Sequence, residues 1–147
     1  MLTLTLPGVP LVYNGQEAGL DKRLNFFARD PIVWRKDAMA GLYRDLAQLR
    51  RENSALSEGG AGAAVRILDG VTSRDVVGFE RKAEDGDRIV VVLNLGGEVQ
   101  DGAGADWAGT MRSVREKGVE VGVGGRLTIQ PWGYDVWARG KEVGGGR

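Results

Sequence analysis

The sequence predicts a mainly β protein, in which an antiparallel β-sandwich follows a shorter segment with one strand and one helix. Glycine is the first observation behind this prediction, because it supplies 24 of the 147 residues, about twice its usual share. Only four glycines lie in residues 1–57, and the other 20 lie in residues 58–147. The second observation is a series of short β-prone runs after residue 63, and the third is one strongly periodic helix before it. We therefore expect two differently built segments, 1–57 and 58–147.

The first segment opens with a short apolar stretch, Met1–Leu6, which is followed by prolines that break any helix. Val9–Tyr13 has the length and the β-branched content of a buried strand. Asn14-Gly15 ends that run, since Asn-Gly is a strong turn signal. Residues 16–36 show no periodicity and carry several aromatic side chains, which predicts a long irregular loop.

A helix follows the loop, and we place it at Ala38–Glu52. Asp37 is a suitable N-cap residue. Apolar side chains then recur at helical spacing and form one stripe, made of Met39, Leu42, Tyr43, Leu46 and Leu49. Arg50 and Arg51 lie in the last turn, where cations interact favourably with the helix dipole. Strand, loop and helix together make a single βα unit.

The second segment consists of short β-prone runs separated by glycine-containing and acidic turns, which is typical of an antiparallel sandwich or barrel. The expected strands are Ala64–Leu68, Asp75–Arg81, Arg88–Asn94, Glu98–Gln100, Thr110–Arg115, Val119–Val121, Arg126–Ile129 and Tyr134–Arg139. Ile89–Leu93 is apolar on both faces, which predicts a central strand. Glu84–Asp87 forms a hairpin turn in which Gly86 takes a positive φ, and Trp132-Gly133-Tyr134 joins the last two runs in a second hairpin. The pattern predicts a meander of seven or eight strands.

Composition excludes several classes of function. The 20 basic and 20 acidic residues cancel, so no nucleic-acid partner is expected. No apolar run approaches the roughly 18 to 20 residues that span a membrane, and Met1–Leu6 is too short for a signal peptide. We expect a soluble protein whose location the sequence leaves unknown. The absence of Cys and His removes disulfides, imidazole catalysis and the commonest metal ligand, so no metal site is predicted.

Three stretches, in order along the chain, resemble the C-terminal part of α-amylase-family glycoside hydrolases, numbered family 13. Leu6–Glu17 is similar to the segment G-x-P-x-x-Y-x-G-x-E around the eighth barrel strand of that family. Leu46–Leu56 resembles the end of the last barrel helix, L-x-x-L-R-x-x-x-x-A-L. The runs Val77–Arg81 and Ile89–Asn94, with the closing Pro-Trp-Gly-Tyr, resemble the β-sandwich called domain C. The resemblance implies a sandwich of domain C type after a one-unit remnant of a (β/α)₈ barrel.

The resemblance also implies a retaining mechanism that uses two carboxylates about 5 Å apart. In the family these residues, and a third stabilising aspartate, come from barrel strands four, five and seven, all upstream of Met1. We therefore assign no catalytic residue and expect the chain to be inactive alone. The parent enzyme would act on α-1,4-glucans or related oligosaccharides and would need an N-terminal barrel of roughly 250 residues as partner. No cofactor is assigned; the parent could bind calcium, but no ligand set for it is visible in this sequence.

The barrel-strand motif supplies the candidate site residues, as structural or substrate-mouth positions: Gly8, Pro10, Tyr13, Gly15, Gln16 and Glu17. Glu17 follows a barrel strand at the end where active sites form. Its role in the family is to hold the mouth of the barrel, and a lone carboxylate cannot perform a double displacement. Asp21 and Asp30 are expected to fix the loop by hydrogen bonds.

Aromatic residues of the sandwich support a different class of function. Trp107, Trp132, Tyr134 and Trp137 could form a platform on which sugars stack, which would make the chain a non-catalytic carbohydrate-binding or structural module. Trp132 and Tyr134 alternate in phase and would share one face, whereas Trp137 would point to the other. Packing into the core is the favoured role for such residues, because sandwich aromatics usually pack.

A single barrel strand without its neighbours leaves backbone groups unpaired and apolar surface exposed. We therefore expect residues 1–35 of the isolated chain to be poorly ordered or prone to aggregation. The helix is expected to dock its leucine stripe on the sandwich and to stay folded.

Overall fold

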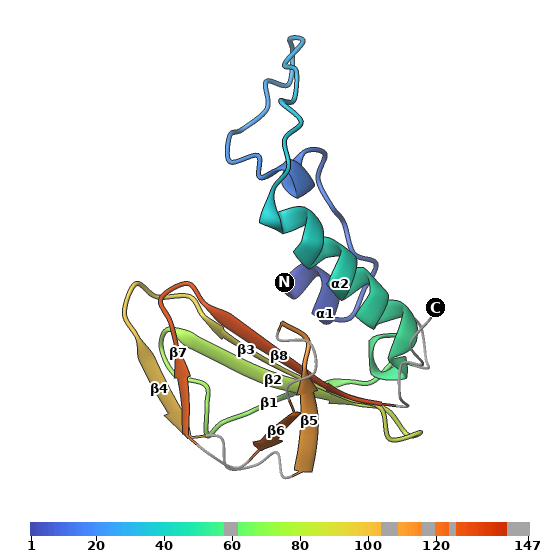
Figure 1. Ribbon diagram of the computed structural model, residues 1–147, viewed down its shortest axis with the longest axis vertical. Coiled ribbons are helices and arrows are strands. Elements are labelled where there is room, and N and C mark those ends of the chain that lie inside the picture. Colours follow the sequence, from blue (N-terminus) through green and yellow to red (C-terminus); the bar gives the residue numbers. More distant parts are fainter. Residues whose placement is uncertain (58–61, 104–108, 116–119, 124–125, 141–147) are drawn as a thin grey trace.

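The computed structural model describes residues 1–57, 62–103, 109–115, 120–123 and 126–140. Within these ranges two α-helices and two 3-10 turns precede eight strands (Figure 1). The helical elements are α1 (Leu2–Thr5), η1 (Gln16–Ala18), α2 (Ala38–Glu52) and η2 (Ser54–Leu56). The strands are β1 (Val65–Ile67), β2 (Val76–Lys82), β3 (Arg88–Asn94), β4 (Gln100–Ala103), β5 (Gly109–Ser113), β6 (Glu120–Val123), β7 (Arg126–Ile129) and β8 (Tyr134–Arg139).

The strands form two sheets, which confirms the antiparallel β-sandwich. The larger sheet has the order β1-β2-β3-β8-β5-β6, and the smaller one pairs β4 with β7. Every described pairing is antiparallel. The order is not the simple meander that the sequence suggested, because β8 inserts between β3 and β5.

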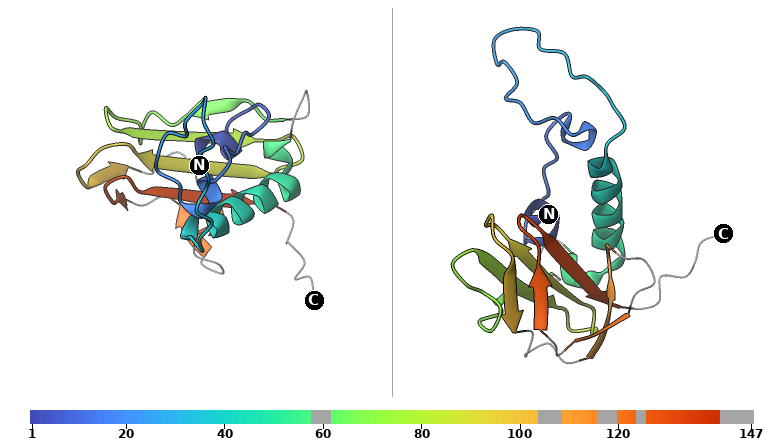
Figure 2. Two further views of the ribbon diagram at one scale, coloured as in Figure 1. Left: turned by 90° about the horizontal axis from the view of Figure 1, so that it is seen from above. Right: turned by 60° about the vertical axis from the view of Figure 1, so that its left-hand side comes forward.

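Two apolar cores cover opposite faces of the larger sheet. The sandwich core lies toward β4 and β7 and includes Val90 and Val92 of β3 together with Trp137. The helix-side core takes the alternate residues of β3, Ile89, Val91 and Leu93, and is closed by Leu56, α1 and Leu49 of α2. Because neighbouring side chains of a strand point to opposite faces, β3 is covered on both sides, as its sequence predicted. Figure 2 shows the helices on one side of the larger sheet and the smaller sheet apart from them.

Two further elements agree with the sequence. The helix α2 spans Ala38–Glu52 as expected, and Asp37 caps it by accepting a hydrogen bond from the Met39 backbone N–H at 2.9 Å. Gly86 has φ +96° in the turn between β2 and β3, which confirms that hairpin.

The end of α2 is fastened to that hairpin. The Ser54 backbone N–H donates to Asp87 at 2.7 Å, and the Ser54 hydroxyl donates to Asp85 at 2.7 Å. The Asn53 side-chain amide donates to the Arg139 carbonyl of β8 at 3.2 Å. These bonds fix the position of α2 relative to the sandwich. No described helix has the length and hydropathy needed to cross a membrane.

Two further expectations are wrong. Val9–Tyr13 is not a strand but an irregular segment, with Val9 87% and Leu11 74% exposed. The described residues offer it no partner strand, and Pro10 cannot donate to a ladder. The last two strands are also not a hairpin, because β7 pairs with β4 and β8 pairs with β3 and β5.

The turn between β7 and β8 instead carries the chain from the smaller sheet to the larger one. Trp132 has φ +56° there, and its backbone N–H donates to the Gly96 carbonyl at 3.1 Å. The side-chain amide of buried Asn94 donates to the carbonyls of Ile129 and Gln130. This turn is therefore fastened to the loop after β3, which redirects the chain out of the smaller sheet.

Candidate functional site

The barrel-strand motif ends in a compact turn tied to α2. Gly15 has φ +92° and caps η1, and its carbonyl accepts from the backbone N–H groups of Ala18 and Leu20. The Gln16 side-chain oxygen accepts from the Tyr13 backbone N–H and from the Tyr43 hydroxyl of α2, both at 3.0 Å. Gln16 therefore joins the motif to the helix that follows it.

Glu17 lies beside Gln16 in η1 and is half-buried. Its Oε2 atom is buried and accepts no hydrogen bond from the described residues. A buried acceptor without a partner is costly, by about 1–3 kcal/mol. This carboxylate oxygen is therefore the part of the motif that is left unsatisfied.

Two arginines hold the start of the chain through its backbone carbonyls. Arg50 of α2 donates to the carbonyls of Leu4 at 3.0 Å and Gly8 at 2.5 Å. Arg81 of β2 is 1% exposed and donates to the carbonyls of Thr5 at 3.2 Å and Ala63 at 2.8 Å. Burial, together with the charge of Arg50, lowers the pKa of Arg81 from its usual value. Arg50 thus holds the backbone at Gly8, the first residue of the motif.

The loop between η1 and α2 extends away from the sheets (Figure 1). Asp30 fixes it, as expected, by accepting from the Lys22 ammonium at 2.5 Å and from the Asn25 backbone N–H at 3.0 Å. These two hydrogen bonds hold the pKa of Asp30 below its usual value. At the base of the loop, Arg35 donates to the carbonyls of Ala18 and Gly19.

Large apolar side chains on this part of the chain face solvent. We call the following set the apolar face: Val9, Leu11, Val12, Tyr13, Phe26, Phe27, Val33 and Trp34, which are 42–94% exposed. Phe26 and Phe27 contact each other edge to face, with ring centroids 5.0 Å apart. Exposed apolar groups at this density mark an interaction surface or an aggregation liability.

The aromatic residues of the sandwich lie in different environments and do not form one platform among the described residues. Trp137 is 5% exposed in the sandwich core, whereas Tyr134 packs against the helix-side core, so the two do point to opposite faces. Trp132 precedes β8 in the turn and is 72% exposed. Trp107 lies outside the described residues.

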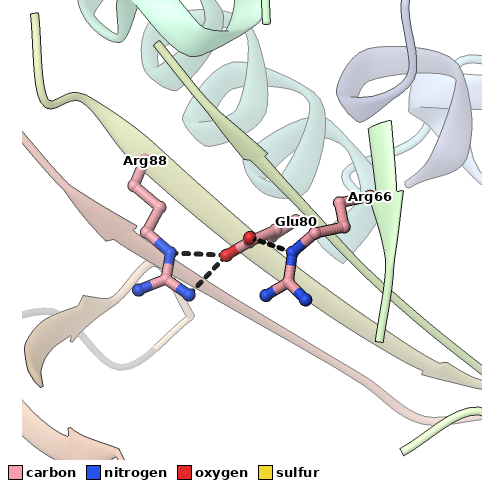
Figure 3. A network of polar contacts seen from close by, with 3 residues as sticks. All are labelled: Arg66, Glu80 and Arg88. Carbon is pink, nitrogen blue, oxygen red and sulfur yellow. Dashed lines mark hydrogen bonds and ion pairs between the residues drawn. The ribbon is translucent and has the colours of Figure 1, made fainter. Parts of the chain in front are cut away.

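One buried carboxylate lies on the sandwich-facing side of the larger sheet. Glu80 of β2 accepts from Arg88 of β3 at 2.7 Å through Nε, and from Arg66 of β1 (Figure 3). Burial acts to raise the pKa of Glu80, but the hydrogen bonds from Arg66 and Arg88 outweigh it and hold the pKa below its usual value. Both carboxylate oxygens of Glu80 accept hydrogen bonds from arginines. Arg66, Glu80 and Arg88 therefore form a structural ion network and not a catalytic pair.

The sequence pattern does not predict that Arg50 and Arg81 bind backbone carbonyls. From its place in the last turn of α2, Arg50 is expected only to interact with the helix dipole. Arg81 continues the alternation that buries Phe79, so its position in β2 indicated the helix-facing side. An arginine near a strand end is ordinarily expected in solvent. Among the described residues no three acidic side chains form a set that could hold a metal ion.

This chain is similar in sequence to parts of longer proteins. No protein-family model matches it. It is 38% identical over 98 residues to α-amylase MalA of Haloarcula japonica, a match that covers 64% of this chain and 14% of MalA. It is 27% identical over 149 residues to neopullulanase 2 of Thermoactinomyces vulgaris, covering 93% of this chain and 24% of that protein.

Solved structures agree in fold. A pullulanase from Anoxybacillus sp. LM18-11 superposes with a TM-score of 0.61 at 16% identity, over 95% of this chain and 22% of the pullulanase. Trehalulose synthase MutB from Pseudomonas mesoacidophila MX-45 gives a TM-score of 0.51 at 23% identity, over 68% of this chain and 17% of the synthase. These relatives and neighbours are family 13 enzymes, which confirms the resemblance in the sequence. The chain spans about a seventh to a quarter of the curated relatives that it matches.

Proposed function

We propose that the chain is the C-terminal part of an α-amylase-like glycoside hydrolase that acts on α-glucans, and that it is inactive by itself. Residues 1–57 would supply the last βα segment of the barrel, and residues 58–147 the sandwich that follows it. Two curated relatives with glycoside hydrolase names, each matched over a minor share of its length, support this proposal.

The observation that carries the proposal is the apolar face around the barrel-strand motif. The exposed residues Val9, Leu11 and Val12 stand where the family places a barrel strand between two neighbours. Strands of a parallel barrel are buried on both faces and are accordingly apolar. An upstream barrel is therefore the partner that would cover this segment. Glu17 Oε2, which accepts no hydrogen bond from the described residues, is one atom that such a partner would have to satisfy.

The chemistry of the chain agrees with an auxiliary role. A retaining glycosidase needs a nucleophile and an acid/base about 5 Å apart. Glu17 is the carboxylate of the motif, whereas Asp30 is engaged with Lys22 and Asn25 in the loop. We therefore place the reacting carboxylates in the partner barrel and give this chain the work of closing and supporting it.

The first experiment assays the purified 147-residue chain on soluble starch and maltooligosaccharides. We expect no release of reducing ends above the buffer control. Measurable hydrolysis that survives repurification would overturn the claim of inactivity. The DNA upstream of the Met1 codon provides an independent check, because an in-frame or frameshifted barrel there supports the proposal and its absence favours a stand-alone module.

A chimera tests the role of the apolar face. The quarter of neopullulanase 2 that matches this chain is replaced by this chain, and the chimera is expected to keep hydrolytic activity. Leu11→Asp should lower its activity and its Tm, because the side chain would be buried in the barrel. The same change in the isolated chain, where Leu11 is 74% exposed, should leave the Tm unchanged. If the folded chimera keeps the same activity and the same Tm after Leu11→Asp, the proposal is contradicted.

A sugar-stacking surface at Trp132 is a second candidate function. The indole is 72% exposed at a turn residue with positive φ, a conformation that is uncommon for a bulky residue. Such a display favours contact with a flat partner, and aromatic faces are suited to sugar rings. Retardation of the chain in starch-containing gels, lost on Trp132→Ala, would support this function; equal retardation of both proteins would exclude Trp132.

A further inference from the structure

The first eight residues connect the sandwich to the barrel-strand motif, and we call Met1–Gly8 the strap. The strap contains α1 and ends at the first residue of the motif. Leu2 and Leu6 pack against the helix-side core. Leu4 and Thr5 are buried. Figure 1 shows α1 beside α2 and next to the larger sheet, so the position of the strap decides where the motif begins.

Arginines from two different parts of the chain hold the backbone carbonyls of the strap. A helix leaves its last carbonyls without partners of its own, and α1 has only four residues. Arg50 of α2 donates to the carbonyls of Leu4 and Gly8. Arg81 of β2 donates through Nη1 to the carbonyl of Thr5 at 3.2 Å. Guanidinium groups therefore bind the strap both from α2 and from the larger sheet.

Arg81 is the arginine of this pair that joins the strap to the sandwich. Arg50 and the motif belong to the same βα unit, so their contact is local to the barrel remnant. Arg81 lies in the sandwich, 76 positions along the chain from Thr5. Its Nε also donates to the carbonyl of Ala63, just before β1, at 2.8 Å. One guanidinium group thus binds the strap and the start of the sandwich together.

The surroundings of Arg81 indicate that carbonyl binding is its specific task. The side chain is 1% exposed, and no acidic side chain of the described residues forms an ion pair with it. The positive charge of Arg50 is close by. Burying a charge without a counter-charge is costly, and apolar side chains of similar volume often replace buried charges without loss. The bonds to Thr5 and Ala63 are therefore what distinguishes an arginine from an apolar residue at this position.

We propose that Arg81 is a positioning residue, which fixes the start of the barrel-strand motif relative to the sandwich. It acts through the strap, because the bond to Thr5 holds the strap and the strap ends at Gly8. The role in catalysis rests on the function proposed above. In the parent enzyme the sandwich would in this way hold the eighth barrel strand in place, and Arg81 would not touch the substrate.

The first test measures amide hydrogen exchange in the isolated 147-residue chain. The Leu6 amide, which donates to the Leu2 carbonyl at 2.9 Å, reports on the strap, and the amide of Val91 in β3 reports on the sandwich. Arg81→Met should lower the protection of Leu6 about tenfold relative to that of Val91, because the bond from Arg81 to the strap is lost. Arg81→Lys keeps the charge without the fork of donors and should cause a smaller loss. Lys82→Met is the matched control, because it removes an exposed cation from the next position of β2.

The outcomes of this test separate positioning from simple stabilisation. A loss at Leu6 that exceeds the loss at Val91, and that is absent in Lys82→Met, supports the proposal. If Arg81→Met does not fold, Arg81→Lys provides the same comparison. Unchanged protection of Leu6, or equal losses at Leu6 and Val91, overturns the proposal, because Arg81 would then serve only the stability of the whole chain.

The second test uses the chimera with the neopullulanase 2 barrel, assayed well below its Tm. Arg81→Met should lower kcat/KM of the folded chimera about tenfold, since small displacements of an active site are costly in rate. Lys82→Met should leave kcat/KM unchanged. An unchanged kcat/KM in Arg81→Met overturns the role in catalysis. A chimera that is inactive even with Arg81 in place contradicts the proposed function instead, and the exchange test still decides whether Arg81 holds the strap.

Discussion

The stability of the sandwich depends on pH through the carboxylate of Glu80. Its side chain is 9% exposed and lies between Arg66 and Arg88 on neighbouring strands (Figure 3). The pKa of Glu80 in the folded chain is below its ordinary 4.5. As pH falls, the unfolded chain therefore takes up this proton first. The stability that the ionised carboxylate contributes is present above about pH 4.5 and is lost as pH drops through the folded pKa.

Replacing this carboxylate should remove that pH dependence. Glu80→Gln is expected to lower the free energy of unfolding by about 2 kcal/mol at pH 7, because it leaves Arg88 with a neutral partner in a buried place. The difference from wild type should shrink as pH falls from about 5 to 3. Urea denaturation at several pH values measures it, with exposed Glu98→Gln as the control. A Glu80→Gln deficit that stays constant across this range contradicts the argument.

The β2–β3 hairpin depends on the left-handed backbone conformation of Gly86. Gly86 and Gly97 are alike in that a Cβ on either meets nothing within 4 Å, but only Gly86 has a positive φ. Gly86→Ala should therefore cost about 1–2 kcal/mol of stability. Gly97→Ala should be neutral or slightly stabilising. Thermal denaturation of the two variants measures the contrast, and similar Tm values would mean that the turn relaxes to a different type.

Elements with a strong local signal could be predicted from sequence. Both ends of α2 follow from its Asp37 cap and apolar stripe, and β3 follows from its continuous apolar run. The β7–β8 connection could not, because strand pairing is set by long-range contacts such as those of Asn94, which the local pattern does not contain. The strand predicted at Val9–Tyr13 is absent for a related reason. Its apolar residues are typical of a buried strand, but the described residues supply no neighbouring strand to pair with it.

The candidate site was predictable in its residues but not in its contacts. The motif indicated Gln16 and Glu17, whereas the bridge from Gln16 to Tyr43 joins positions 27 residues apart. Arg81 was missed because its acceptors are backbone carbonyls, which no side-chain pattern can reveal.

The chain combines a sheet that is covered on both faces with one segment, Val9–Tyr13, for which the described residues supply no partner strand. Native-state hydrogen exchange should reveal this difference, because amides exchange through local openings whose free energy follows burial and hydrogen bonding. Amides of Ile89–Leu93, paired on both sides by β2 and β8, should exchange only through global unfolding. Amides of Val9, Leu11 and Val12 should exchange within seconds. In the chimera with a barrel, the same three amides should become protected by several orders of magnitude while those of β3 change little. Strong protection of this segment in the monomeric chain would contradict the view that it needs a partner, and with it the proposal that the apolar face belongs inside a barrel.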